Sequence, residues 1–428
     1  MKRNLLIQMR NEWRDNLWLM LGLAIVSLTI WLFCSALFST TKNYFLPLGF
    51  DEEDVYVLSV GHLEPTAPTY IDFGELTREK ASDDMRGLIA RIRESQNVEV
   101  AAFSDNGTPY KMSAINSGLN IIGEEPDTIG FVGNFRSLSP EGVKVLRLRS
   151  LTGKDENYLK GKLESGEILV SPDPYWEREK MSVLNEWGVP VSRFPAEELV
   201  GKNVIMNNDS ASRYHVADAV ALVRRSSFDN PWGGGVILPI NEAGDICRVR
   251  EILVRVKPGN GDKFCQEFES TPDMLSRRNT YLYGLTSLSD MGTAVEKDDV
   301  LDVRLYVALI IFFLIILFLG LLGTFWFRMQ QRVSEIAIRR VCGASRWAIF
   351  RRVFGEGMLL LIGASVLAAI VGWAFIKQTD LIQGFSDIEL IWFELATMAI
   401  VAVGIVLSII YPAWRAMQIE PAEAVRDE

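Results

Sequence analysis

The residues of this chain best suited to specific chemistry are arginines gathered between positions 328 and 352. Guanidinium groups bind carboxylates and phosphates through paired hydrogen bonds. Glu335 is the acid among them, and it precedes Arg339 by four residues, the favourable order for an ion pair on one helix face. The basic members are Arg328, Arg332, Arg339, Arg340, Arg346, Arg351 and Arg352.

Gly343 and Ser345 divide this basic segment. Glycine ends a helix readily in the left-handed conformation, and serine caps the start of the next helix. Ile336 and its neighbours Val333 and Ala337 give the first helix an apolar flank. The sequence therefore predicts a short, charged helix–break–helix within 328–356, with Ala344 in the break.

Other patterns that carry chemistry are missing from the sequence. His62 and His215 are its only imidazoles, and no metal-ligand spacing surrounds them, so we predict structural or surface roles. A phosphate loop is absent: Gly153-Lys154 and Gly201-Lys202 lack the earlier glycine and the following Ser or Thr. With no nucleophile elbow either, we predict a chain that is not an enzyme and holds no cofactor or metal.

Four apolar stretches must position the basic segment. A helix of about 20 residues spans the hydrocarbon core of a bilayer. The stretches are 17–38, 303–327, 357–376 and 390–411. The predicted fold is a four-helix membrane domain, arranged one plus three, with a large extracytoplasmic α/β (α+β) domain at 39–302.

Basic residues near the membrane ends predict the orientation, because cytoplasmic flanks retain Lys and Arg. This places 1–16, the loop 328–356 and the tail 412–428 in the cytoplasm, with both termini. The short loop 377–389 then lies outside with the inserted domain. The net charge is −10 although these inner parts are basic, so the inserted domain is acidic, which argues against nucleic acid as a partner.

The first residues, 1–16, place Leu5, Leu6, Met9 and Trp13 at helical spacing between basic residues. This predicts an interfacial helix along the inner leaflet, with a basic start that only sets topology as the alternative. The first apolar stretch is too long for a typical signal sequence and is predicted to stay uncleaved.

Three further features within the apolar stretches and the inserted domain leave alternatives open. Cys247 and Cys265 share the outer side and are either bridged or two unpaired thiols. Glu394 lies in the fourth stretch, as a functional carboxylate or one that reaches the headgroups. Small residues in the third stretch allow close helix packing, including packing across a dimer. They are Gly363, Ala364, Ala368, Ala369 and Gly372.

Helix and strand signals alternate within the inserted domain. Amphipathic spacing predicts a helix over 83–96, and a shorter one is expected around 262–268. Alternating or continuous apolar runs predict strands at 98–103, 143–148, 167–170, 214–223, 236–238 and 251–256. A turn-rich segment at 104–140 separates two predicted lobes.

Several motifs resemble a known family. Arg332–Arg346 resembles the signature loop of FtsX-type ABC transporter permeases, and 411–416 with 420–426 is similar to their usual ending, through Pro412, Ala413, Pro421 and Ala422. Fragments of the inserted domain resemble a MacB-like periplasmic core domain. They are 166–171, 199–202, 214–220 and 252–259.

The resemblance implies a function by mechanotransmission in the cytoplasmic (inner) membrane. A cytosolic ABC ATPase dimer, which binds ATP and Mg, would dock on Arg332–Arg346 and drive the outer domain to export or hand over a substrate. A second permease chain, and a periplasmic adaptor with an outer-membrane channel, are the further expected partners. MacB fuses its ATPase to its permease, whereas this sequence resembles split systems.

Three alternatives to this reading remain. In the first, the arginines bind anionic lipid headgroups of the bilayer and have no other role. The chain could be an FtsX-like regulator of an outer partner such as a cell-wall hydrolase. It could also be a membrane receptor or scaffold without an ATPase.

Overall fold

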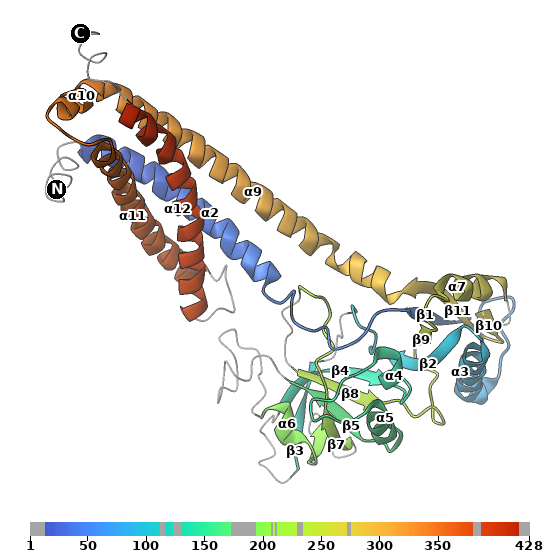
Figure 1. The fold of residues 1–428 in the computed structure, drawn as a ribbon. Coiled ribbons are helices and arrows are strands. Elements are labelled where there is room, and N and C mark those ends of the chain that lie inside the picture. The colour runs from blue at the N-terminus through green and yellow to red at the C-terminus, as the bar shows by residue number, and fades with distance from the viewer. Residues whose placement is uncertain are drawn as a thin grey trace. The chain divides into compact units, whose positions relative to one another are not determined.

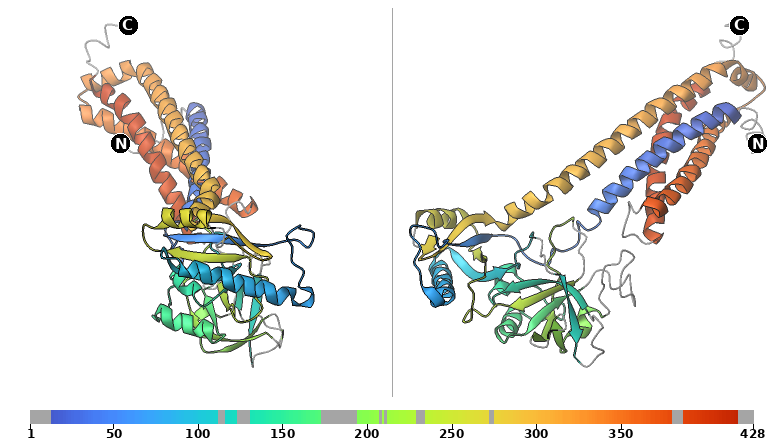
Figure 2. Two further views of the ribbon diagram at one scale, coloured as in Figure 1. Left: turned by 90° about the vertical axis from the view of Figure 1, so that its right-hand side faces the viewer. Right: turned by 180° about the vertical axis from the view of Figure 1, so that it is seen from behind.

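The protein, seen in a computed structural model, consists of two compact units (Figures 1 and 2). The helical unit comprises Met1–Lys42 and Asp298–Glu428, and the α/β unit comprises Asn43–Lys297. The residues that the structure describes are 13–111, 116–122, 131–172, 194–206, 209, 212–228, 234–271, 275–379 and 387–418. Most of the predicted interfacial helix at 1–16 lies outside these residues, and Trp13 to Asn16 belong to the first long helix.

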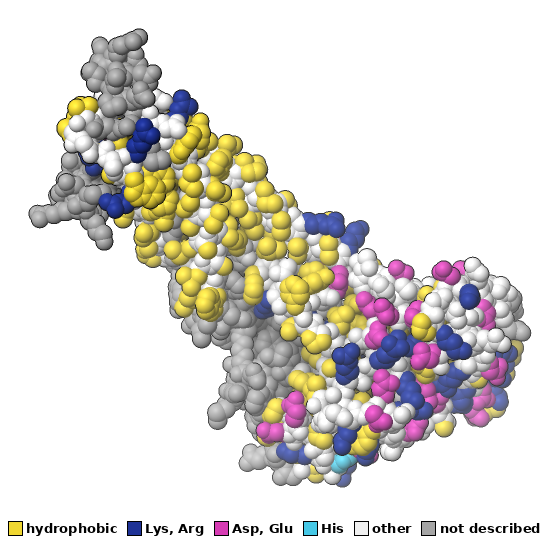
Figure 3. Space-filling model, viewed as in Figure 1, with side chains coloured by type: hydrophobic (Ala, Val, Ile, Leu, Met, Phe, Trp, Pro, Cys, Tyr) yellow, Lys and Arg dark blue, Asp and Glu magenta, His cyan; other side chains and the backbone are white. Residues whose placement is uncertain are grey.

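Among the residues that the structure describes, four helices are long and apolar enough to cross a membrane, and each contains one of the predicted stretches. They are α2 (Trp13–Thr41), α9 (Leu288–Gln331), α11 (Arg346–Thr379) and α12 (Asp387–Gln418). On the face seen in Figure 3, apolar side chains cover most of the length of these helices, whereas acidic and basic side chains gather on the α/β unit. The helices extend beyond the apolar stretches, because hydropathy marks the length that suits lipid and not the length of the helix.

Side-chain contacts fix the directions of these helices. Phe33 of α2 lies against Tyr306 and Phe313 of α9, with ring centroids 6.5 and 5.9 Å apart, so the end of α2 lies beside the apolar start of α9. Trp326 of α9 stacks on Tyr411 of α12. The ends of α9 and α12 therefore lie together at the opposite end of the helical unit.

Small residues of α11 pack against α2 of the same chain. A side chain at Gly363 would meet the Met20 sulfur, and one at Gly372 would meet the ring of Trp31. Ala364 is also buried. Close helix packing, predicted from these residues, is thus present within one chain.

The α/β unit begins with a five-stranded antiparallel sheet, here called the sheet lobe. Its strand order is β10-β11-β1-β9-β2. The helices α3 (Thr77–Glu94) and α7 (Gly261–Ser270) contribute buried side chains to the core on one face of this sheet. The strands are β1 (Val55–His62), β2 (Val98–Asp105), β9 (Glu251–Val256), β10 (Ser276–Arg277) and β11 (Thr280–Ser287), and a short 3-10 helix, η1 (Gly74–Leu76), precedes α3.

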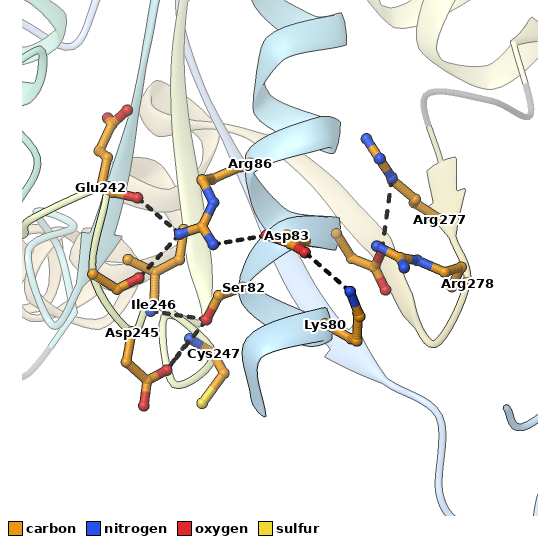
Figure 4. Close-up of polar contacts among 12 residues, drawn as sticks. Lys80, Ser82, Asp83, Arg86, Glu242, Asp245, Ile246, Cys247, Arg277 and Arg278 are labelled. Atoms are coloured by element: carbon orange, nitrogen blue, oxygen red, sulfur yellow. Dashed lines mark hydrogen bonds and ion pairs between the residues drawn. The ribbon is translucent and has the colours of Figure 1, made fainter. Parts of the chain in front are cut away.

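Polar contacts from α3 fasten it to neighbouring segments (Figure 4). Arg278 donates to the buried Asp84 carboxylate at 2.5 Å. Arg86 donates to the carbonyls of Glu242 and Gly244, and also to Asp83 at 2.9 Å. The hydrogen bond from Arg86 lowers the pKa of Asp83. The helix is therefore held to the β10–β11 hairpin and to the loop that contains Glu242 and Gly244.

The remaining six strands form a closed ring, here called the barrel lobe. Neighbours pair in the order β4-β3-β6-β7-β5-β8, and β8 pairs back to β4 in parallel. Short helices α4 (Gly142–Leu146), α5 (Glu156–Glu164) and α6 (Ala196–Leu199) accompany them. The strands are β3 (Asn116–Ile121), β4 (Phe131–Leu138), β5 (Ile168–Ser171), β6 (Asn203–Met206), β7 (Arg213–Ala219) and β8 (Gly234–Pro239).

The two lobes share one continuous sheet, because β2 pairs with β4 over Ser104↔Leu138 and Asp105↔Ser137. A core of buried residues from both lobes fills the space between them, with α4 and α5 contributing Val143 and Leu159. Arg255 of β9 is also buried here, and its guanidinium donates to the carbonyls of Asp51, Glu53 and Val145.

Two local predictions are wrong. The predicted strand 143–148 is instead the helix α4 followed by a turn. Val143, Val145, Leu146 and Leu148 are all buried, so the alternation of apolar residues marked burial and not strand periodicity. The segment 104–140, predicted to be turn-rich, contains β3 and β4.

Candidate functional site: a basic helical elbow

The predicted helix–break–helix is present at the end of α9. This region, called the basic elbow below, consists of the last turn of α9, the helix α10 (Val333–Val341) and the first turns of α11. Gly343 has φ +93°, a conformation that suits glycine. The hydroxyl oxygen of Ser345 accepts from the amide of Ala348 at 3.2 Å and so caps α11, as predicted. Most of the predicted cytoplasmic loop at 328–356 is therefore helical.

The predicted ion pair of Glu335 and Arg339 also forms. The Nε and Nη2 atoms of Arg339 donate to Oε1 of Glu335 at 3.0 and 2.6 Å. Both side chains are more than 40% exposed, at 43% for Glu335 and 42% for Arg339. Exposed helical pairs contribute only about 0.3–0.5 kcal/mol. The pair thus holds the two charges in position and adds little stability.

One face of α10 is fastened to both neighbouring helices. Ile336 is buried in a small cluster with Met329 of α9 and Ile349 of α11, and Val353 packs against it. Ala337 is fully buried. Because these contacts reach both helices, a displacement of α10 would act on α9 and α11 together.

A groove between the three helices brings part of the predicted site together. Arg332, Glu335, Ile336 and Arg339 line it, as predicted members of the site. The groove is completed by Phe325, Arg328, Met329, Ile349, Arg352 and Val353. Gly343, Ala344, Ser345 and Arg346 belong to the turn and the start of α11 and do not line it. The side chain of Arg340 lies outside the described residues.

The opposite face of the elbow exposes apolar side chains, which the sequence reasoning missed. Ile338 and Val341 of α10 are 61% and 69% exposed, and Trp347 of α11 is 64% exposed. Trp347 stacks on Phe350, with ring centroids 5.0 Å apart. The sequence feature that indicates this surface is the three-residue spacing of Ile338 and Val341, which puts both side chains on one face of α10. Neighbouring exposed apolar side chains are typical of a surface that binds another molecule.

The second predicted motif is described only in part. Pro412 lies buried inside α12, the ring of Trp326 in α9 stacks on that of Tyr411, and the guanidinium of Arg415 lies over the Trp326 ring. Pro421 and Ala422 lie outside the described residues, as do the side chains of Ala413 and of Glu394.

Residues considered for other chemistry have structural partners. The His62 ring contacts the hydroxyl of Thr280 and the carbonyl of Cys247, each at 3.1 Å. His215 contacts Asn203 at 3.0 Å. Cys247 and Cys265 are both free thiols. Among the described residues, no group of three or more His, Cys, Asp or Glu side chains is arranged to hold a metal ion.

Comparisons with known proteins find a family model and a relative that each match part of this chain. Residues 307–421 match the family model of the FtsX-like permease C-terminal domain. The macrolide export ATP-binding/permease protein MacB of Syntrophobacter fumaroxidans is 27% identical over 195 residues, which are 45% of this chain and 24% of that protein. The chain therefore matches about a quarter of the length of this relative.

Two solved structures resemble the chain more distantly. The periplasmic region of MacB from Actinobacillus actinomycetemcomitans has a TM-score of 0.31 at 9% identity, over 60% of this chain and 98% of that one. The extracellular domain of the ABC-type transporter YknZ from Gram-positive bacteria has a TM-score of 0.29 at 10% identity, over 53% and 100%. The predicted resemblance to FtsX-type, MacB-like permeases is confirmed, most directly by the permease domain at 307–421.

Proposed function

We propose that this chain, whose residues 307–421 form an FtsX-like permease domain, is the membrane subunit of an ABC transporter complex. In this proposal a separate ATPase dimer docks on the basic elbow in the cytoplasm. Both termini lie on the same side, and the α/β unit, placed between the first and second of four spans, lies outside. Motion of the elbow is transmitted through the spans to the α/β unit, which exports or hands over a substrate.

The two faces of α10 carry this proposal. On its inner face Ile336 packs against α9 and α11 and Ala337 is fully buried, whereas Ile338 and Val341 are exposed on the outer face. A partner bound to the outer face of α10 could displace α9 and α11 together, because the inner face of α10 is packed against both helices. Helices transmit such displacements over their whole length.

Anionic lipid is the alternative ligand of the elbow, and its binding would require different residues. Lipid headgroups need only the arginines. A docking protein also needs the apolar residues, because apolar contacts at the centre of an interface supply most of its binding energy. Substitutions at Ile338 and Val341 therefore separate the two occupants.

The deciding experiment is purification of the tagged full-length chain from its native membrane in mild detergent. We expect a protein with ATPase motifs to co-purify. In the variant Ile338→Asp/Val341→Asp its yield should fall at least about tenfold, because a charge is buried at the contact. Leu151→Asp is the matched control, since Leu151 is a half-exposed apolar residue of the α/β unit. An ATPase retained equally by all three proteins would refute docking at the elbow.

Mechanotransmission needs a second measurement. Two permease chains are expected in each complex, so spin labels at exposed positions of the α/β unit report the spacing between its two copies. We expect this spacing to differ between nucleotide-free and ATP-trapped complex. An unchanged spacing, with the ATPase bound, would leave docking intact and refute the motion.

A further inference from the structure

A rigid aromatic turn directly follows the first apolar helix. Tyr44 lies against both Phe45 and Phe228, with ring centroids 5.3 and 5.1 Å apart. Phe45 is 89% exposed, and Leu46 beside it is also exposed. These three consecutive residues, Tyr44 to Leu46, are called the aromatic turn below.

A buried arginine holds the aromatic turn in place. Arg224 is 4% exposed, and its guanidinium donates to the carbonyls of Asn43, Leu46 and Ser227 at 3.0, 2.9 and 2.8 Å. The amide of Leu46 donates to the carbonyl of Asn43 at 3.0 Å. The exposure of Phe45 is therefore a fixed feature of this turn.

The same loop is also tied to the start of α9. The carboxylate of Glu296 accepts from the amide of Ser227 at 2.6 Å and from the hydroxyl of Ser226 at 3.3 Å. The set of Arg224, Ser226, Ser227 and Glu296 is called the Arg224 clasp below. It joins the segment that follows α2 to the segment that precedes the apolar part of α9.

The covalent chain limits how far this turn can lie from a bilayer. Phe45 follows Thr41, the last residue of an apolar helix, by four positions, a reach of at most about 14 Å for an extended chain. Glu296 lies seven residues before the apolar stretch that begins at Val303 in α9, a helical rise of about 10 Å. Each of these two distances is an upper limit. Both are short enough to keep the turn close to the headgroup layer that borders the hydrocarbon core.

We propose that the aromatic turn inserts its Phe45 and Leu46 side chains into the phospholipid headgroup layer next to the first span. Tyr44, beside these two apolar side chains, is an amphipathic aromatic residue of the kind that favours this layer, and Lys42 provides a basic residue at the same place. The three side chains are too few to form a stable interface with a second chain, which needs about 800 Å² per partner. Lipid is the occupant that a small apolar patch next to a span suits.

The test places a fluorescent label at the turn in the full-length chain. A variant with Ala or Ser at the four native cysteines receives Phe45→Cys, is labelled with an environment-sensitive dye and is inserted in phospholipid nanodiscs. Leu76→Cys and Leu151→Cys are matched controls, because both are exposed apolar positions of the α/β unit and lie much further along the chain from α2 and α9 than Phe45 does. Lipids with a nitroxide at the headgroup, or at the top of the acyl chain, serve as quenchers.

We expect severalfold stronger quenching of the dye at position 45 than at either control, together with a blue shift of its emission. Quenching at position 45 equal to that at the controls would overturn the proposal. A blue shift without lipid quenching would also overturn it, and would identify a protein occupant such as a second copy. The readout needs no ATPase, so its failure is distinct from failure of the proposed function.

Discussion

The basic elbow and the Arg224 clasp are two regions where the chain meets the ends of its apolar helices, and they are built in opposite ways. In the elbow the charges are exposed, as in the pair of Glu335 and Arg339. In the clasp the charged group, Arg224, is buried and bound to three carbonyls of its own chain. The charged pair of the elbow is accessible to solvent, whereas the guanidinium of the clasp holds two segments of one chain together.

This difference has a mechanical meaning for the proposed function. A force that enters at α10 reaches α9 through the cluster of Met329, Ile336 and Ile349. Glu296, in the same helix, is bonded to the loop of Ser226 and Ser227, which leads from β7 to β8 of the barrel lobe. A displacement of α9 along its axis would therefore act on this loop of the barrel lobe as well as on β11 of the sheet lobe, which continues directly into α9.

The largest expected effect comes from removing the charged side chain of the clasp. In Arg224→Ala, three carbonyls lose a charged donor, and each such hydrogen bond contributes about 1.5–3 kcal/mol. We expect the local stability to fall by at least about 3 kcal/mol, which is roughly a hundredfold faster amide exchange at 43–48 and 224–228. Hydrogen-exchange mass spectrometry of the full chain measures this.

Arg225→Ala is the matched control for that prediction. Arg225 is the next residue along the chain and is exposed. Its removal should change the local stability by less than about 0.5 kcal/mol. Equal effects of the two substitutions would show that the clasp does not depend on the buried guanidinium, and the contrast with the elbow would fail.

A smaller effect is expected at the other end of the clasp. Glu296→Gln keeps the shape of the side chain but removes the charge that accepts from Ser226 and Ser227. Charge-assisted hydrogen bonds are about twice as strong as neutral ones, so we expect a loss of about 1–2 kcal/mol. Exchange should accelerate at 225–228 and at the start of α9, with 43–46 less affected. Acceleration at 43–46 alone would contradict the proposed connection.

Sequence reasoning succeeded where the signal is local. The ion pair of Glu335 and Arg339, the turn at Gly343 and the cap at Ser345 each depend on residues within a few positions of one another. The four apolar helices were equally visible, because a membrane span needs a continuous run of apolar residues.

The clasp and the barrel lobe could not be predicted in the same way. Arg224 and Asn43 lie far apart in the sequence, and nothing near Arg224 marks it as buried. The helix α4 was mistaken for a strand because the sheet lobe and the barrel lobe enclose Val143 and Val145 from both sides. Tertiary packing overrides local periodicity in such segments.

The turn of the elbow provides a prediction of intermediate size. Gly343→Ala places a Cβ on a residue with φ +93°, which should cost about 1–2 kcal/mol and loosen the junction of α10 and α11. Gly355→Ala is the control within α11, where nothing lies within 4 Å of the added Cβ. There alanine should stabilise the helix by up to about 1 kcal/mol. Amide exchange across 333–356 should change in opposite directions in the two variants, and a change in the same direction would exclude strain at Gly343 as the cause.

The smallest expected effect distinguishes the elbow most sharply from the clasp. A double-mutant cycle of Glu335→Ala and Arg339→Ala, followed by amide exchange in α10 of the isolated chain, should give an interaction energy of about 0.3–0.5 kcal/mol, because both side chains are exposed and screened. The same variants should weaken co-purification of the ATPase more than this value explains, since the partner then meets charges that are missing or misplaced. An interaction energy above about 1.5 kcal/mol would mean that the charged pair of the elbow, like Arg224 in the clasp, mainly stabilises the chain itself. Docking would then have to rest on Ile338 and Val341 alone.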